Sequence, residues 1–598
     1  MRELLMGNQA IAMGAICCGV GLVAGYPGTP SSEILETVAK RNPGHIYVEW
    51  SVNEKSAMEV AAGASYAGMR TMVTMKQVGL NVASDPLMSL AYIGVKGGMV
   101  VVVADDPGPI SSQTEQDTRH FAIFSKLPVF DPSSPEEAYQ MIGDAFAYSE
   151  KYHTPVLFRP TTRICHGYAT VDVDDAYQEI KPEGFIKDPK WTIFPSLAYQ
   201  SHLKIEARQP IIAEDFSSYH FNTITGNAKA RSGIATGGIS YAYTCEALAA
   251  LNGECKLFKV ATPHPFPEKL ALEFLSGLDE VLVVEELDPV IEKELLYLCG
   301  KYHLPITIKG KLTQDMPNAG ENKVESVNWA IVKFLSLPIS PAGMPFDLPK
   351  LPVRPPSLCA GCPHRASFYA VKQAMKGQKA VFSGDIGCYT LGNAKPLSMV
   401  DTCLCMGAGI TIAQGLHRAE PDAVNFAFIG DSTFFHTGIP GVINAVYNQT
   451  DIVIIILDNS TTAMTGHQPH PGTGATVMGN ISQKISISEV LKALGVRHVV
   501  TQNPFNLEQT ITAVKEAAAF KGVSAIIFEA VCIGRGEKAS LYSIDPSKCT
   551  GCNRCLAELG CPAIVKDDKK VRIDASACFG CSLCLQVCKE KAIGSEKK

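Results

Sequence analysis

The last fifty residues hold eight cysteines, arranged as two CxxCxxC runs that are each followed by a fourth cysteine. Thiolates at this spacing bind [4Fe–4S] clusters, and in a two-cluster module each run supplies three ligands while the fourth comes from the other half of the repeat. Two zinc sites are the alternative, which the duplication and the Cys-Pro pair at 561–562 disfavour. The predicted ligand sets are Cys549, Cys552, Cys555 and Cys588 for one cluster, and Cys561, Cys578, Cys581 and Cys584 for the other.

This tail resembles the two-cluster ferredoxins of bacteria but departs from their pattern twice. Cys555 and Cys561 are separated by five residues rather than three, and Lys589 replaces the second proline. The longer spacing could shift the potential of that cluster, but it removes no ligand.

Oxygen donors that follow two buried strands form a second group of candidate ligands. The apolar runs 424–429 and 452–457 predict strands, and the segment between them has apolar residues at helical spacing. Strand, helix, strand is a parallel crossover unit, and its ligand crevice opens at the carboxyl ends of the strands. Carboxylate and amide oxygens there are the hard donors that Mg²⁺ prefers. The helical positions are Ile439, Val442, Ile443 and Val446, and the donor segments are Gly430, Asp431 and Ser432, then Asp458, Asn459, Ser460 and Thr461.

Four of the six cysteines between residues 357 and 540 form a further candidate ligand set. Cys359 and Cys362 form a CxxC pair, Cys388 follows a Gly-Ile-Gly run, and Cys532 comes after an apolar strand at 525–528. A CxxC pair can be a redox pair, half of a zinc site or half of a cluster site. With the two later sulfurs it would suit a third [4Fe–4S] cluster. Buried apolar cysteines are the alternative, most readily for Cys532.

The first third of the chain offers groups for an organic ligand. Glu54 heads an alanine-rich helix, where it is either a carboxylate in a dry site or a solvated first-turn glutamate, and Glu59 is the competing residue. Thr29 lies in a Gly/Pro turn that opens a helix, whose free N–H groups suit a carboxylate. Arg119 ends a polar loop and could clamp a substrate carboxylate, although a surface ion pair explains it equally well.

These groups must be positioned by several α/β domains. The alternation of strands and helices predicts doubly wound parallel sheets, followed by a small α+β module of ferredoxin type. We expect domains at 1–180, 201–336, 357–540 and 541–598, with a linker at 181–200 and a proline-rich linker at 337–356.

The Gly-Asp pair at 430–431 with Asn459 resembles the thiamine diphosphate motif, and Met464–Gln468 resembles the loop that follows it in 2-oxoacid:ferredoxin oxidoreductases. This resemblance covers essentially the whole chain. It implies that Asp431, the Asn459 side chain and the Thr461 carbonyl hold Mg²⁺ on the diphosphate, with Gly430 and Ser432 beside it. It implies that Glu54 bonds the aminopyrimidine ring in a pyrimidine-type first domain and that residues 201–336 form a transketolase C-terminal-type domain. It also implies a third cluster on Cys359, Cys362, Cys388 and Cys532.

The resemblance is greatest to the α subunits of the arylpyruvate-oxidising members. It implies oxidative decarboxylation of arylpyruvates such as indolepyruvate to aryl-acetyl-CoA, with electrons passed to ferredoxin under anaerobic conditions. It further implies a smaller β subunit and a homodimeric α core. The same chemistry on pyruvate or a branched-chain 2-oxoacid stays open, as does an electron-transfer subunit with a vestigial thiamine fold.

Composition excludes several other classes. The chain has 598 residues, 46% hydrophobic residues and a formal charge of −6, and it shows no basic stripe for nucleic acid. No uninterrupted apolar span suits a membrane helix, and the first residues do not predict a secretory signal. Twenty cysteines in so large a chain without a signal indicate a reduced cytoplasm rather than disulfides.

Overall fold

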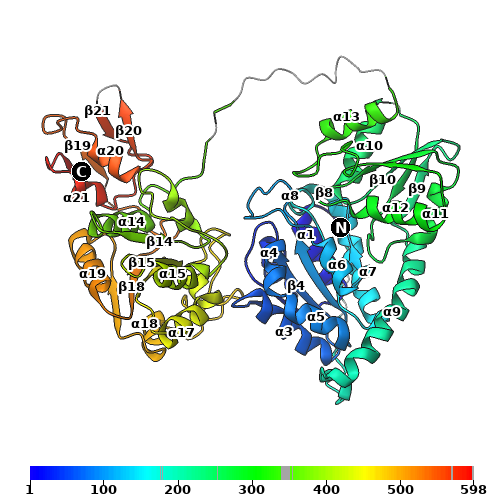
Figure 1. Ribbon diagram of the computed structural model, residues 1–598, viewed down its shortest axis with the longest axis horizontal. Helices are drawn as coiled ribbons and strands as arrows, with labels where there is room; N and C mark the ends of the chain where they lie inside the picture. The colour runs from blue at the N-terminus through cyan, green and yellow to red at the C-terminus, as the bar shows by residue number, and fades with distance from the viewer. Residues whose placement is uncertain are drawn as a thin grey trace. The chain divides into compact units, whose positions relative to one another are not determined.

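The computed structural model describes residues 1–598 except 175–176, 178, 252, 338–350, 353, 540, 568–569 and 596–598. The chain forms two compact units, residues 1–349 and 350–598, and each is described by itself (Figure 1).

A six-stranded parallel sheet forms the first half of unit 1. Its strand order is β3-β2-β4-β5-β7-β6, so β3 is placed on one side of β2 and the four later strands on the other. Alternate residues of the central strands, such as Val101 and Val103, pack on α3, α4 and α5, because side chains of a strand alternate between faces. The elements are β2 Leu22–Gly25, β3 Tyr47–Trp50, β4 Thr71–Lys76, β5 Met99–Ala104, β6 Val129–Phe130, β7 Val156–Phe158, α1 Gly7–Cys17, α2 Ser32–Lys40, α3 Glu54–Tyr66, α4 Gln77–Val82, α5 Ser84–Ile93, α6 Arg119–Ser125, α7 Pro135–Tyr152 and α8 Thr162–His166, with β1 Arg2–Met6 and β8 Tyr168–Asp172 pairing separately.

The second half of unit 1 is a five-stranded sheet of order β13-β12-β10-β11-β9. All its pairs are parallel except the edge pair of β9 with β11. The elements are α9 Pro195–Ser217, β9 Thr223–Gly226, β10 Ser232–Thr236, α10 Ile239–Leu251, β11 Lys256–Lys259, α11 Glu268–Leu275, β12 Glu280–Val284, α12 Val290–Lys301, β13 Thr307–Lys309 and α13 Val324–Phe334.

Unit 2 is organised around a parallel sheet of order β14-β15-β16-β18-β17. Phe426 and Phe428 of β15 point to the face covered by α14 and α19, and Ala427 and Ile429 point to the face covered by α15, α17 and α18. The doubly wound arrangement predicted from the sequence is therefore present (Figure 1). The elements are α14 Pro363–Ala374, β14 Ala380–Ser383, α15 Ala408–Ala419, β15 Val424–Gly430, α16 Asp431–Thr433, α17 Ile439–Tyr447, β16 Ile452–Asp458, α18 Ile487–Ala493, β17 His498–Gln502, α19 Leu507–Ala519 and β18 Val523–Glu529.

The C-terminal module of unit 2 is a duplicated α+β structure. It has two antiparallel strand pairs, β19 with β22 and β20 with β21. Leu559, Leu583 and Val587 of this module belong to the same apolar core as α14 and α19, so the module packs on the parallel-sheet domain of unit 2. The elements are β19 Tyr542–Ile544, α20 Arg554–Leu559, β20 Ile564–Asp567, β21 Lys570–Ile573, α21 Leu583–Val587 and β22 Ile593–Ser595.

Three sequence expectations need comment. The predicted linker at 181–200 is wrong at its end, because α9 already begins at Pro195. Ile443 was expected on the buried face of α17 but is 48% exposed, since the buried stripe runs through Val442 and Ala445. Most of the predicted 337–356 linker lies outside the described residues, and the four domain boundaries stay predictions.

Candidate functional site

The oxygen donors expected for Mg²⁺ meet at the carboxyl ends of β15 and β16. The two strands are adjacent and parallel, with Gly430 opposite Leu457, so the segments that follow them emerge at the same sheet edge. Asp431, Asn459 and Thr461 are all buried, at 3%, 6% and 1% exposure. A hydrogen bond from Thr462 Oγ1 to Ser432 Oγ, 3.0 Å long, ties the two segments together.

Local backbone geometry turns these donors toward one another. Asp431 begins α16 directly after the strand, and a π-helical stretch, η4 Phe434–Gly438, separates α16 from α17. Single π turns of this kind are frequent at functional sites. Ser460 adopts a left-handed backbone with φ of 60°, which reverses the chain between Asn459 and Thr461.

The electrostatics of this edge suit a bound cation. Burial, and then the neighbouring Asp431, raise the pKa of Asp458 to about 6. Two carboxylates thus lie close together at a buried site, an arrangement that a divalent ion would relieve. Thr461 Oγ1 is buried without a hydrogen-bond partner, which leaves a polar atom for a ligand. The residues present therefore fit the Mg²⁺-diphosphate group that the sequence resemblance implies.

Three residues that the sequence reasoning did not assign complete this edge. His470 Nε2 lies 3.1 Å from Asp431 Oδ2, and His364 Nε2 lies 3.3 Å from Asn459 Nδ2. Burial lowers the pKa of His364 to about 4, so this imidazole is neutral at pH 7. Tyr389 packs edge-on against His364, with ring centroids 5.8 Å apart. No spacing rule links these residues to Asp431, although His364 directly follows the CxxC pair and Pro363.

The four cysteines proposed for a third cluster converge in unit 2. Burial, and then the nearby thiols of Cys532 and Cys359, raise the pKa of Cys388 to about 11. Cys362 and Cys359 lie one turn apart, and the N–H of Cys362 donates to the carbonyl of Cys359 at 3.2 Å. The N–H of Cys532 donates to the carbonyl of Asn459 at 3.0 Å. The four-cysteine set therefore adjoins the oxygen donors of the sheet edge.

Cysteines of each predicted tail set also lie close to one another. The pKa of Cys584 is raised to about 12 by burial and then by Cys581, Cys561 and Cys578, which are the other members of its predicted set. Burial raises the pKa of Cys555, and so do Cys588 and Cys552 of the other set. Thiols held this close favour a cluster, because ligation removes their protons and offsets their mutual repulsion.

A cavity marks the position of the set formed by Cys561, Cys578, Cys581 and Cys584. All four cysteines line it, together with Cys362 of the third set and Arg365 of α14. Burial raises the pKa of the Cys362 thiol to about 12, and the Arg365 guanidinium acts in the opposite direction.

In unit 1, Glu54 is a buried carboxylate at the start of α3. It is 5% exposed in the first turn of α3, whose start is capped by Asn53 through a 2.9 Å bond from the Ser56 N–H. A Cβ placed on Gly79 of α4 would lie 2.5 Å from Glu54 Oε1, so the absence of a side chain at Gly79 leaves room for the carboxylate. The competing Glu59 is exposed and pairs with Lys55. Burial therefore favours Glu54.

Lys76 is a cation near Glu54 that sequence reasoning missed. It ends β4, its side chain packs on Gly28 next to Thr29, and its Nζ donates to the carbonyl of Ser111 at 3.0 Å. Burial lowers the pKa of Lys76, and Asp106 and Glu54 oppose that effect. The Ser111 hydroxyl also donates to the carbonyl of Thr29, so the predicted anion-binding turn and this cation are neighbours.

The predicted substrate role of Arg119 is wrong. The side chain is 1% exposed and its donors are taken by protein groups: Asp117, Glu285 and the carbonyls of Glu286 and Asp288. Arg119 instead ties the first sheet domain of unit 1 to the second. Only Asp117 among the groups that hold Arg119 is near it in the sequence. Glu285 and the carbonyls of Glu286 and Asp288 lie 166 to 169 residues away, and only the fold brings them near.

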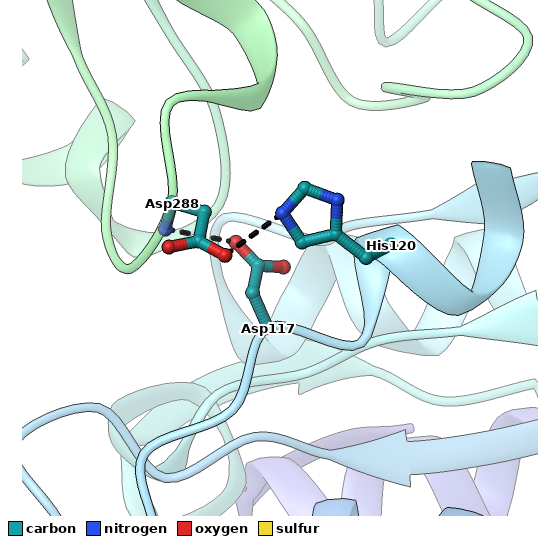
Figure 2. A group of neighbouring side chains, drawn as sticks. All are labelled: Asp117, His120 and Asp288. Atoms are coloured by element: carbon teal, nitrogen blue, oxygen red, sulfur yellow. Dashed lines mark hydrogen bonds and ion pairs between the residues drawn. The ribbon is translucent and has the colours of Figure 1, made fainter. Parts of the chain in front are cut away.

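Asp117, His120 and Asp288 form a three-residue group of metal-ligating type in the same place (Figure 2). Asp117 accepts hydrogen bonds from Arg119 and from the N–H of Asp288, which occupy both its oxygens. His120 Nε2 lies 2.8 Å from Asp288 Oδ2, and both side chains are about half exposed. The group is therefore a domain-joining network rather than a metal site.

Oxygen donors at the tips of a doubly wound sheet, combined with cysteine sets in the same unit, define an iron–sulfur oxidoreductase of the thiamine-dependent type. Three family models match the chain. "Pyruvate flavodoxin/ferredoxin oxidoreductase, thiamine diP-bdg" covers residues 13–219, "Thiamine pyrophosphate enzyme, C-terminal TPP binding domain" covers 385–528, and "4Fe-4S dicluster domain" covers 541–589.

Curated relatives extend this match over the full length. Indolepyruvate oxidoreductase subunit IorA of Methanothermobacter thermautotrophicus is 42% identical over 100% of this chain and 98% of its own. The protein of the same name from Pyrococcus horikoshii is 42% identical over 98% of this chain and 96% of its own. The chain belongs to this IorA family. Among solved structures, 2-oxoglutarate:ferredoxin oxidoreductase from Magnetococcus marinus is similar with a TM-score of 0.44 at 20% identity, over 52% of this chain and 62% of that one.

Among the described residues, no helix has both the length and the apolar character needed to span a bilayer.

Proposed function

We propose that this chain is the α subunit of an enzyme that oxidatively decarboxylates arylpyruvates, indolepyruvate in particular, to aryl-acetyl-CoA and passes the electrons to ferredoxin. The observation that carries the proposal is the 42% identity to an indolepyruvate oxidoreductase subunit over 98% of that protein's length.

When bound, thiamine diphosphate supplies a nucleophilic carbon and an electron sink for decarboxylation of a 2-oxoacid. In this chain Asp431, the Asn459 side chain and the Thr461 carbonyl would hold Mg²⁺ on its diphosphate, beside Gly430 and Ser432. His470 would orient the Asp431 carboxylate through the hydrogen bond between them, which is 3.1 Å long. Neutral His364 would orient the Asn459 amide in the same way.

Glu54 is the residue proposed to hydrogen-bond the aminopyrimidine ring. Its burial supports the assignment, because a carboxylate bonds most strongly where water is excluded. For the substrate carboxylate we assign Thr29 and, in place of Arg119, Lys76. A lysine held near this turn can neutralise an anion without the fixed fork that an arginine presents.

The two tail sets are proposed to carry two [4Fe–4S] clusters, and Cys359, Cys362, Cys388 and Cys532 a third. The hydrogen bond from Cys532 to Asn459 supports a cluster next to the thiamine site. The chemistry that a cluster held by these four cysteines would supply is one-electron transfer between the thiamine site and the tail. We further propose a smaller β subunit as partner, a homodimeric α core and a cytoplasmic location.

The test is a substrate panel on the enzyme purified anaerobically with its β subunit. Ferredoxin reduction is followed with indolepyruvate, phenylpyruvate, pyruvate and a branched-chain 2-oxoacid in the presence of CoA. Preference for the arylpyruvates supports the proposal, whereas equal turnover of pyruvate would assign another 2-oxoacid. Iron, sulfide and thiamine per chain are measured on the same material. About twelve iron atoms indicate three clusters and about eight indicate two; absence of thiamine would indicate an electron-transfer subunit.

A further inference from the structure

Arg365 connects two cysteine sets through main-chain hydrogen bonds. This α14 residue is 4% exposed, and one terminal guanidinium nitrogen, Nη1, donates to the carbonyls of Leu559 and Gly560 at 2.6 and 2.9 Å. Its other terminal nitrogen donates to the carbonyls of Leu358 and Cys359 at 2.6 and 3.4 Å. The first pair lies just before Cys561 of the tail, and the second lies at the CxxC pair of the third set.

The contact with Leu559 and Gly560 gives the lengthened tail spacing a physical role. The five residues between Cys555 and Cys561 let α20 run to Leu559, which is 1% exposed in the core that includes α14. Gly560 then turns the chain with φ of 57°. It packs closely on Pro396, because a Cβ added to Gly560 would lie 2.5 Å from Pro396 Cδ. The extra length thus delivers two carbonyls to Arg365 and anchors the tail on the sheet domain.

Among the described residues, no acidic group balances the charge of Arg365: no carboxylate forms an ion pair with it, and its Nε is buried without a hydrogen-bond partner. The neighbouring acid Glu558 is paired with Arg554 and with Tyr369. A buried cation needs compensation by negative charge, and a cluster ligated by four thiolates carries a net negative charge. Arg365 lines the cavity of the Cys561, Cys578, Cys581 and Cys584 set.

We propose that Arg365 is a positioning and potential-setting residue of the electron path. Its hydrogen bonds fix the 556–560 segment against the CxxC pair. Its charge stabilises the more negative, reduced form of the cluster held by Cys561, Cys578, Cys581 and Cys584, and so raises the midpoint potential of that cluster relative to the other tail cluster. The inference rests on the proposed iron–sulfur function.

The experiment uses the anaerobic holoenzyme with its β subunit and three variants: Arg365→Met, Arg365→Lys and Arg365→Gln. Arg418→Met is the matched control, since Arg418 of α15 also donates to a backbone carbonyl but lies outside the cavity lining. Midpoint potentials are obtained from redox titration followed by electron paramagnetic resonance. The signal of the relevant cluster is identified as the one lost in Cys581→Ser.

We expect the Met and Gln variants to lower that potential by at least about 59 mV, a tenfold shift of a one-electron equilibrium. The Lys variant keeps the charge and should retain most of the wild-type midpoint potential. Arg418→Met should leave that potential unchanged. Unshifted potentials at full iron content would overturn the proposal. If Arg365→Met loses iron, the comparison of Arg365→Lys with Arg365→Gln decides. A lower midpoint potential in the Gln variant than in the Lys variant supports the proposal. Equal potentials in the two variants, or loss of iron from the Lys variant, overturn the proposal. Wild-type enzyme without clusters would instead refute the proposed function.

Discussion

Glu54 can be displaced without being replaced, by the substitution Gly79→Ala. The added Cβ would lie 2.5 Å from Glu54 Oε1 and 2.8 Å from Glu54 Cγ. Side chains do not tolerate such contacts, and the groups in the way are the flexible end of a glutamate rather than backbone. The carboxylate therefore moves while α4 keeps its course.

The expected cost falls on activity more than on stability. Alanine in place of glycine favours a helix by roughly 0.5–1 kcal/mol, and overpacking a tight contact costs about 1–3 kcal/mol, so the free energy of unfolding should fall by about 2.5 kcal/mol at most. A displacement of roughly 1 Å in a group that must contact the cofactor reduces rate about 10²-fold. That factor corresponds to about 2.7 kcal/mol of activation free energy.

The assay is reduction of ferredoxin, or of a viologen dye, by the anaerobic holoenzyme with indolepyruvate and CoA. Thiamine diphosphate per chain is measured on the same samples. We expect Gly79→Ala and Glu54→Gln to lose turnover to a comparable extent while retaining the cofactor, because the diphosphate is held by other residues. Gly63→Ala is the matched control: Gly63 is an exposed residue of α3 with no atom within 4 Å of the added Cβ. It should be slightly stabilised and fully active.

Turnover of Gly79→Ala within twofold of wild type, with thiamine content intact, would refute the role assigned to Glu54. Complete loss of thiamine from both variants would refute the separation between residues that hold the cofactor and the residue that activates it.

Three further predictions address other parts of the chain. Asp431→Ala should abolish Mg²⁺-dependent retention of thiamine diphosphate but leave iron per chain unchanged; a variant that still carries thiamine would contradict the sheet-edge site. Lys76→Met should raise the KM for the 2-oxoacid about 10–100-fold with a smaller effect on kcat, the loss expected for one charge-assisted hydrogen bond; an unchanged KM would exclude Lys76 from carboxylate binding. Burial raises the pKa of Glu286 to about 7 from 4.5. The contribution of Glu286 to the free energy of unfolding is therefore complete below pH 4.5 and is lost as the pH rises through 7. The free energy of unfolding falls by up to about 3 kcal/mol over that range. In urea unfolding at pH 5.5 and pH 8, Glu286→Gln should show a smaller pH dependence than wild type, and an equal dependence would contradict this assignment.

The fold class and the ligand segments could be predicted from the sequence because their signals are local. The strands at β15 and β16, the helix between them and the two CxxCxxC runs each lie within a few dozen residues. Parallel-sheet topology then places the ends of neighbouring strands together, so Asp431 and Asn459 had to meet. The ligand sets of the tail followed from the repeat alone and stay predictions until iron is measured.

Other features depend on contacts between distant segments, which no local pattern encodes. Arg119 reads as a substrate residue in its loop, yet Glu285 and Asp288 bury it. His470 and His364 reach the sheet edge from a loop and a helix that carry no motif for that role. Lys76 lies beside Glu54 only because β4 and α3 are neighbours in the folded domain.

The sequence by itself determined which chemistry the chain can carry, since cysteine spacing and strand-end carboxylates are properties of short segments. The tertiary structure alone decided which charges are available for that chemistry. It neutralised Arg119 with buried acids and left Arg365 without an ion pair among the described residues, because the partner of a buried charge is set by packing across the whole unit.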